Sequence, residues 1–479
     1  MNDGQIRRLL TNESRWWRDG GWERDDPDLR EIADLPFAYR PAPLADLQPP
    51  GLYVLRGPRR VGKSVEVKRT IAAVLAAGAN PRLVSFCACD SLTAQDLHRL
   101  IAVGQKDAAT LTGDRYWFLD EITAVPGWAS AIKRLRDTDP DFRRSCVVLS
   151  GSSARDLREA TKALAGRRGD AVDSDRLLLP MTFRQFCLAI GGFESLPDAA
   201  LRPSELVTGT GEEEVAALLP FFSDLDHAWQ SYLRVGGFPR AVGDFVQTAD
   251  VSASFVRDLW DAIAGDAFVR TEMSDGKTAA LLERFAKGLA SPLNASAVAR
   301  DVGFSSHHTI EARIDALNLA LMAWRCHPVT KHRLPNMRAQ EKVYFIDPLV
   351  SRLPHLRDPR RHEPDDSRLT EQQLGLLLLR ACGDGGPGSL LEGSTVMYER
   401  TSGRAEIDFV GPDLGPAFEA KYVDGPWRRS ARPLRAQHGG GVLATRTVLE
   451  LEDRRDPSPV WAIPVGILAW LLRAEGSPS

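Results

Sequence analysis

The feature that most constrains this chain is the run Gly57-Pro-Arg-Arg-Val-Gly-Lys-Ser64, which fits the pattern G-x-x-x-x-G-K-[ST] at every fixed position. An apolar run at 52–55 precedes it and predicts a buried strand, and residues 65–77 contain neither glycine nor proline, as a helix interior requires. Glycines let successive backbone amides point at one centre, and the start of a helix favours an anion there. The stretch therefore predicts a phosphate-binding loop. The alternative is a chance glycine-rich turn between a strand and a helix.

This loop supplies the first candidate ligands for ATP and Mg²⁺. Lys63 is expected to reach the β- and γ-phosphates, and the Ser64 hydroxyl is expected to bind Mg²⁺. The residues of the loop that we expect to contact nucleotide are Gly57, Pro58, Arg59, Arg60, Val61, Gly62, Lys63 and Ser64.

Two carboxylates end a second apolar strand, predicted over 115–120. Asp120, at the strand tip, is expected to hold the Mg²⁺ water shell opposite Ser64, and Glu121 is expected to polarise the attacking water. A third apolar strand over 145–149 leads into Ser150-Gly-Ser-Ser153. A small hydroxyl there, such as Ser152, could sense the γ-phosphate or the water, or the segment could be a turn with an N-cap.

Arg167 is the candidate for an arginine that contacts phosphate, in its own chain or in a neighbouring subunit of an oligomer. The alternative is a solvated surface arginine.

Several of these segments together resemble the AAA-type P-loop ATPases of bacteria and archaea, in which the ATPase precedes a C-terminal region of uncharacterised function. The segments are Gly57 to Ser64, Phe118-Leu-Asp-Glu-Ile122, Pro126-Gly-Trp128, Leu149-Ser-Gly-Ser-Ser153 and Ala165-Gly-Arg167. The resemblance implies an α/β P-loop NTPase core of AAA type, which we place at 51–195.

Length and composition bound the remaining possibilities. With 479 residues the chain is too long for one ordinary core. Its 43% hydrophobic and 26% charged residues are typical of soluble globular proteins, and its net charge of −3 argues against a surface coated in basic patches. No apolar run is long enough for a membrane span, and the N-terminus lacks an apolar signal core. These features predict a cytoplasmic protein without a membrane partner.

The flanking and middle regions are predicted from their composition and rhythm. Residues 1–50 carry Trp16, Trp17 and Trp22 among charges, so we expect an arm packed on the ATPase core; a stacking platform for bases is the alternative. Residues 196–290 are predicted to be helical.

Residues 291–350 show two predicted helices separated by a turn and followed by two apolar pieces, the pattern of a winged helix. Its second helix, with His307, His308 and Arg313, could enter a DNA groove, or the module could serve only for packing.

The C-terminal region, 351–479, contains Asp408 and, after a Gly/Pro turn, Glu419-Ala-Lys421. This layout resembles the PD-(D/E)xK core of restriction-endonuclease-like nucleases, with Glu371 matching their accessory helix acid. The resemblance implies an α/β fold in which Asp408 and Glu419 hold Mg²⁺ and Lys421 orients or activates water. A nuclease fold kept as a scaffold and a hairpin with solvent-facing charges are the alternatives. Candidates for a cationic groove are Arg428, Arg429, Arg432 and Arg435.

Two functions follow from these predictions. In the first, ATP binding controls a nuclease-like, DNA-processing domain. In the second, the protein is an ATP-dependent switch or scaffold that binds a protein partner and cleaves nothing.

Overall fold

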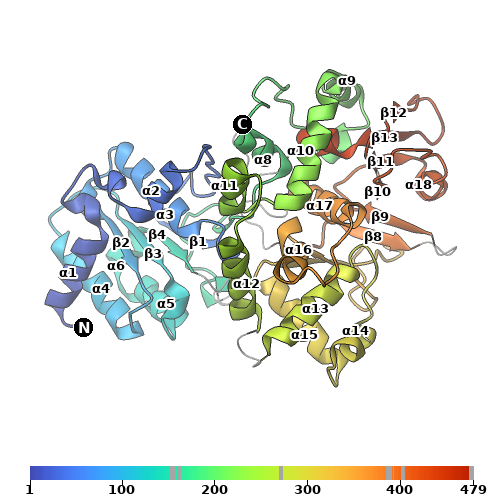
Figure 1. Ribbon diagram of the computed structural model, residues 1–479. Helices are drawn as coiled ribbons and strands as arrows, with labels where there is room; N and C mark the ends of the chain where they lie inside the picture. The colour runs from blue at the N-terminus through green and yellow to red at the C-terminus, as the bar shows by residue number, and fades with distance from the viewer. Residues whose placement is uncertain are drawn as a thin grey trace.

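The computed structural model describes residues 1–151, 157–158, 163–268, 273–383, 391, 393–400 and 405–473, without the side chains of 265–268. The blue and cyan N-terminal part of the chain forms one lobe, and the green to red remainder forms a second lobe (Figure 1). None of the described helices is long and apolar enough to cross a membrane.

The first lobe is built on a parallel sheet with the strand order β2-β3-β4-β1-β5. Its strands are β1 (Gly51–Arg56), β2 (Val84–Ala88), β3 (Tyr116–Asp120), β4 (Cys146–Ser150) and β5 (Asp175–Leu177). They are apolar almost throughout because both faces of the sheet are covered. Leu52 and Val54 belong to one core cluster and Tyr53 and Leu55 to another, as expected for side chains that alternate across a strand.

Helices and the N-terminal segment cover these two faces. The helices are α1 (Asp3–Glu13), α2 (Pro27–Ala33), α3 (Lys63–Ala76), α4 (Ala94–Asp107), α5 (Trp128–Thr138) and α6 (Pro140–Arg144). Helices α1, α4 and α5 contribute to the cluster that contains Leu52, and α3 contributes to the cluster that contains Tyr53.

The tryptophans of the N-terminal segment anchor it to the sheet. Trp16 and Trp22 are buried edge to face with ring centroids 4.9 Å apart. The indole N–H groups of Trp16 and Trp17 both donate to the Val84 carbonyl oxygen, at 2.9 and 2.8 Å. These residues pack on the first lobe, and the buried rings offer no platform for bases.

The second lobe has one continuous core that extends from Leu177 to Leu472. Its helices are α8 (Phe183–Ile190), α9 (Gly209–Ala217), α10 (Phe222–Val235), α11 (Pro239–Thr248), α12 (Ala253–Phe268), α13 (Asp275–Lys287), α14 (Ala295–Val302), α15 (His307–Leu319), α16 (Pro348–Arg357), α17 (Asp366–Ala381), α18 (Arg432–His438) and α19 (Val465–Leu471). Phe183 and Phe186 belong to this core, so α8 packs with the second lobe. By sequence, α8 lies within the predicted ATPase domain, 51–195.

A glycine corner joins α10 to α11. Gly236 has φ of 74°, and a Cβ atom there would lie 2.0 Å from Asp347 Oδ1. The Gly237 N–H donates to Asp347 Oδ2 at 2.7 Å. The glycines therefore permit a close approach that ties this corner to the start of α16.

The middle region has the element order expected for 291–350. Helices α14 and α15 are followed by an antiparallel pair, β6 (Ala323–Cys326) and β7 (Lys342–Phe345).

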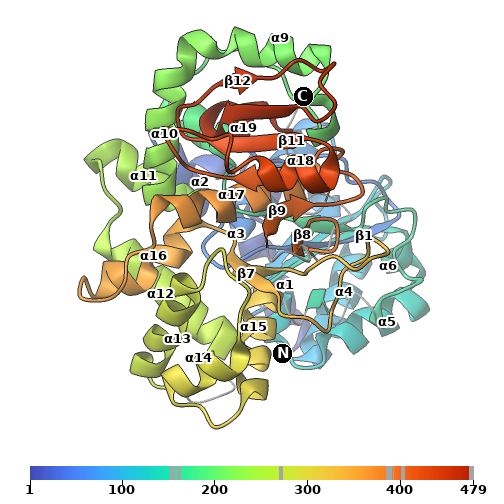
Figure 2. The same ribbon diagram turned by 90° about the vertical axis from the view of Figure 1, so that its right-hand side faces the viewer.

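The C-terminal region contains a mixed sheet with the strand order β12-β13-β11-β10-β9-β8. Figure 2 shows β12, β11, β9 and β8 of this sheet in that order. The strands are β8 (Met397–Arg400), β9 (Glu406–Val410), β10 (Phe418–Ala420), β11 (Gly441–Thr445), β12 (Glu450–Leu451) and β13 (Val460–Pro464). Helices α17 and α19 contact the face of this sheet that belongs to the large core, and α18 packs on a separate cluster with Ile407 and Leu443.

Candidate nucleotide site and acidic cluster

The P-loop lies between the end of β1 and the start of α3. Gly62 has φ of 100°, and a Cβ atom on Gly57 would lie 2.3 Å from the Leu178 carbonyl oxygen, so both positions require glycine. Lys63 is buried, and its Nζ donates to the carbonyl oxygens of Gly57 and Pro58 at 3.0 Å each. The lysine thus lies across its own loop, beside the backbone amides that begin α3.

Asp120 and Ser150 end two neighbouring strands on the P-loop edge of the sheet. The Ser150 hydroxyl donates to Asp120 Oδ1 at 2.6 Å, and the Glu121 N–H donates to the same oxygen at 3.0 Å. Because β4 lies between β1 and β3, Ser150 stands between the P-loop strand and Asp120. The carboxyl ends of these three strands therefore bring the loop and the acidic pair to one edge, with Ser64 in the first turn of α3.

Sequence predicts the residue that fixes Asp120 only in part. It places a hydroxyl near the phosphates within the segment 150–153, but Ser152 lies outside the described residues. The hydroxyl that contacts Asp120 belongs to Ser150, the last residue of a buried parallel strand, and that position is the signal that identifies it.

Glu121 follows Asp120 in a left-handed conformation, with φ of 50°. Such a conformation costs a non-glycine residue of the order of 1–3 kcal/mol and tends to occur at functional sites. It turns the chain from β3 into the short helix Ile122–Ala124 and leaves Glu121 half-buried at the sheet edge.

Arg167 does not lie at this edge. The carbonyl oxygen of its neighbour Arg168 accepts from the N–H of Leu52, near the start of β1. β1 has six residues, and at about 3.3 Å per residue it separates its start from the P-loop by roughly 16 Å. The Arg167 guanidinium pairs with both oxygens of Asp137, at 2.8 and 3.0 Å. The structure therefore does not support the expected contact of Arg167 with phosphate in the same chain.

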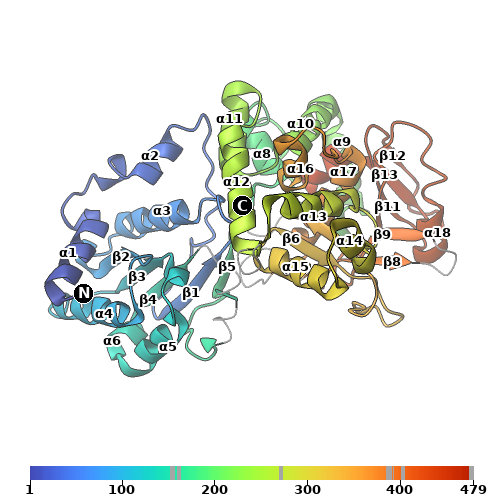
Figure 3. The same cartoon turned by 60° about the horizontal axis from the view of Figure 1, so that its bottom comes forward.

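A cavity of about 280 Å³ opens beside the P-loop, between the two lobes. Its lining includes Glu31, Leu35, Arg60, Val65, Phe255 and Asp258. Arg60, inside the P-loop, pairs with Asp258 of α12 at 3.4 Å, and Arg240 of α11 pairs with Glu31 at 2.8 Å. Figure 3 shows α12 standing between the first lobe and the rest of the second lobe.

The C-terminal candidates also converge. Lys421 Nζ lies 2.7 Å from Glu419 Oε1 and 3.9 Å from Asp408 Oδ2. The Asp408 N–H donates to Glu419 Oε2 at 3.2 Å. Glu371 reaches the same cluster from α17, because the Lys342 amine bridges it to Asp408. The spacing of these residues in the sequence thus corresponds to real proximity.

The electrostatics of the cluster follow from its burial. Burial, and after it the neighbouring charge of Asp408, raises the pKa of Glu419 to about 8 and that of Glu371 to about 7. For Lys421, burial lowers the pKa, but the charges of Asp408 and Glu419 outweigh it and the net direction is upward. The lysines act in the opposite direction, since their charges and hydrogen bonds lower the pKa of both glutamates.

This arrangement does not fit a divalent cation held by Asp408 and Glu419. Among the described residues, a group of three potential ligand side chains with neighbouring donor atoms lies elsewhere, at His307, His308 and Glu311. A lysine amine also contacts Asp408 and Glu371 directly. The expected role of Asp408 and Glu419 as metal ligands is therefore not supported in this conformation.

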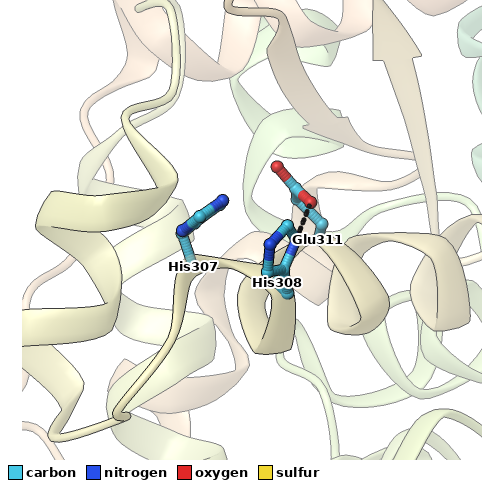
Figure 4. A group of neighbouring side chains, drawn as sticks. All are labelled: His307, His308 and Glu311. Atoms are coloured by element: carbon cyan, nitrogen blue, oxygen red, sulfur yellow. Dashed lines mark hydrogen bonds and ion pairs between the residues drawn. The ribbon is translucent and has the colours of Figure 1, made fainter.

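The three residues of that group lie at the start of α15 and are exposed (Figure 4). His308 Nδ1 is 3.2 Å from Glu311 Oε2, and the two imidazole rings have centroids 4.0 Å apart. This position at the start of a helix is unfavourable for a cation, because the N-terminus of a helix carries the positive end of its dipole. Arg313, the third candidate for a DNA groove, is buried on the same helix, so its guanidinium is not offered to a groove.

Two of the four candidate groove arginines are engaged with acids. Arg428 pairs with Glu450, and Arg435 pairs with Glu452 through both of its terminal nitrogens. These pairs reduce the positive charge that the segment can present to a phosphate backbone.

The sheet order, the P-loop and the acidic strand tip define the first lobe as a P-loop nucleotide-binding domain. The sequence profile of an AAA domain matches residues 50–187. The N-terminal region is therefore an AAA-type ATPase domain. A domain of unknown function (DUF8612) matches residues 226–353, and comparison with curated proteins finds no match.

Solved structures show distant likenesses. A Walker-type ATPase of Pyrococcus abyssi is 14% identical, with 70% of this chain and 95% of that chain covered and a TM-score of 0.37. The ORC1 protein of Aeropyrum pernix, solved in complex with DNA, is 14% identical, with 72% and 96% covered and a TM-score of 0.29. The ORC2 protein of the same organism, in its ADP form, is 13% identical, with 66% and 86% covered and a TM-score of 0.30. Since these scores are low, the class assignment rests on the site geometry and the AAA-domain match.

Proposed function

We propose that this protein is a Mg²⁺-dependent ATPase that acts as a switch, in which the nucleotide at the P-loop sets the arrangement of the second lobe. The observation that carries the proposal is the pair Arg60 and Asp258, which joins the P-loop directly to α12. A change at the phosphate site is thereby passed to the second lobe through a single side-chain contact.

The residues of the first lobe have distinct roles in this proposal. Lys63 exchanges its contacts with Gly57 and Pro58 for phosphate oxygens when ATP binds. Ser64 and Asp120 would hold Mg²⁺, which would supply positive charge against the phosphates, and Ser150 orients the Asp120 carboxylate. Glu121 orients and polarises the attacking water.

The cavity between the lobes is the proposed site for the base and sugar of the nucleotide. It begins at Val65, directly after the P-loop serine, and Leu35 and Phe255 give it apolar walls. Bound nucleotide would then contact both lobes, and its triphosphate would compete with Asp258 for the Arg60 guanidinium.

Hydrogen exchange of α12, measured with and without ATP, tests the switch. ATP should change the exchange of α12 in the natural protein, and Asp258→Asn should abolish that response. Asp261→Asn removes the same charge from an exposed position on the same helix and should keep the response. Identical α12 exchange in the presence and absence of saturating ATP would contradict the proposal.

A second candidate function is DNA cleavage controlled by ATP. The proximity of Asp408, Glu419 and Lys421 favours it. The contacts of the Lys342 amine with Asp408 and Glu371 oppose it. Cleavage of single- and double-stranded DNA with Mg²⁺ or Mn²⁺, with and without ATP, decides the matter against a Lys421→Ala control. Cleavage that is absent from the control would establish the nuclease, and no cleavage leaves the switch.

A further inference from the structure

Lys342 is the most deeply buried cation of the acidic cluster, although it comes from a different part of the fold. It opens β7 of the middle region, and its side chain has no exposed surface. Its amine contacts Glu406 Oε1 at 2.7 Å, Glu371 Oε1 at 2.8 Å and Asp408 Oδ1 at 3.1 Å. The hairpin β6–β7 thus inserts a positive charge among acids of α17 and β9.

The contacts use most of the hydrogen-bonding capacity of this amine. Two of its three N–H donors bond to Glu371 and Asp408, and the Glu406 carboxylate lies at ion-pair distance, 2.7 Å away. A buried charge is tolerated when it is paired in this way, whereas removing one partner leaves the other charge buried and uncompensated. The Tyr344 hydroxyl also donates to Glu371 Oε1, at 2.5 Å, so β7 contributes two groups to the same carboxylate.

The oxygens that would bind a metal are turned toward lysines and backbone amides. Asp408 Oδ2 accepts from the Ala420 N–H at 3.0 Å, while Asp408 Oδ1 faces Lys342. Glu419 divides its oxygens between Lys421 and the Asp408 N–H. Mg²⁺ requires an octahedron of oxygens at about 2.0–2.1 Å, and an ammonium group between two of the carboxylates opposes it by both space and charge.

We infer that Lys342 is the resident cation of this cluster. It locks the hairpin β6–β7 to the C-terminal sheet and excludes a divalent metal, and the cluster takes up such a metal only when the amine is removed. The inference is independent of the nucleotide site, because none of its residues belongs to the first lobe.

Binding of Mn²⁺ to the full chain without nucleotide, followed by electron paramagnetic resonance, tests the exclusion. Asp408→Asn should leave the Mn²⁺ isotherm of the natural protein unchanged, because the cluster holds no metal. Lys342→Met, which keeps the side-chain length and removes the charge, should gain one Mn²⁺ site per chain. Adding Asp408→Asn to that variant should remove the site again.

Lys421→Met is the matched control, since it removes the other lysine of the cluster and leaves Lys342 in place. It should gain no Mn²⁺ site. A Mn²⁺ site in the natural protein that is lost in Asp408→Asn would overturn the inference, and so would a folded Lys342→Met variant without a new site.

Lysine labelling of the natural protein keeps the test decisive if Lys342→Met does not fold. Under native conditions an amine-reactive ester should modify Lys421, whose side chain is 37% exposed, and leave Lys342 unmodified. Peptide mass spectrometry reads out both sites. Equal labelling of the two lysines would show that the hairpin is not locked to the sheet.

Discussion

Glu121 and Asp120 are adjacent, yet their side chains have different tasks at the P-loop edge. Asp120 is buried and fixed by Ser150, whereas Glu121 is half-buried in a left-handed turn. We expect Glu121→Gln to keep ATP binding and to lower the hydrolysis rate by about 10²- to 10⁴-fold, the usual contribution of a general base. A phosphate-release assay beside a binding titration separates the two effects. Unchanged turnover would remove Glu121 from the mechanism.

Lys63 affects binding itself. A hydrogen bond from a charged group contributes about 1.5–3 kcal/mol, so Lys63→Ala should weaken ATP binding at least about tenfold. Titration with a fluorescent ATP analogue measures the change. Lys68→Ala is a suitable control, because that lysine lies on the same helix but pairs with Asp26 and Asp28. Equal affinity in the two variants would contradict the assigned role of Lys63.

The residues that sequence could and could not predict differ in a physical way. Lys63, Asp120 and Lys421 lie in local patterns whose spacing fixes their neighbours, so the sequence predicted them. Lys342 and Ser150 act through partners that are distant in the chain, and no local pattern carries that information. The expected contact of Arg167 with phosphate in its own chain is not seen for the same reason, because it depends on where the returning chain pairs with β1.

Among the elements, α16 depends on a single carboxyl at its start. Asp347 caps the helix by accepting from the Leu349 N–H at 2.9 Å and also accepts from the Gly237 N–H. Burial raises its pKa from 3.8 to about 7. Between these values the folded protein holds a proton that the unfolded chain has lost, so this contribution to stability is full below pH 4 and declines as the pH rises to 7.

Asp347→Asn should therefore flatten the pH dependence of stability between about pH 4 and 7, where one proton accounts for at most about 1.4 kcal/mol per pH unit. Chemical denaturation at several pH values measures this. A variant with the same pH slope as the natural protein would show that Asp347 is ionised in the fold.

At the scale of elements, sequence predicted the strands that end at the P-loop, at Asp120 and at Ser150, because burial on both faces leaves short apolar runs. It did not predict how they group. The predicted divisions at 195 and 290 lie at loops, whereas the division at 350 falls inside α16, and one apolar core extends from Leu177 to Leu472. Contacts between regions that are distant in the chain do not change the local hydrophobic pattern of either region, so the pattern does not predict them.

For the whole molecule, the separate cores predict two unfolding units. The second lobe should unfold as one transition in scanning calorimetry, and the first lobe as another. ATP with Mg²⁺ at 100 times its Kd should stabilise a transition that includes the first lobe by about 2.7 kcal/mol. Three or more resolved transitions would show that the second lobe divides into independent parts.

The N-terminal segment gives this arrangement a mechanical consequence. Leu35 packs over Gly243 of α11, Phe37 and Tyr39 pack against the second lobe, and Leu44 is back in the core of the first. The chain crosses again at 177–181, where Leu178 belongs to the first lobe and Leu179 to the second. Two bodies joined at two separate points keep one easy degree of freedom, rotation about the line through those points. A nucleotide bound in the cavity between the lobes, as proposed above, would therefore bear on this rotation.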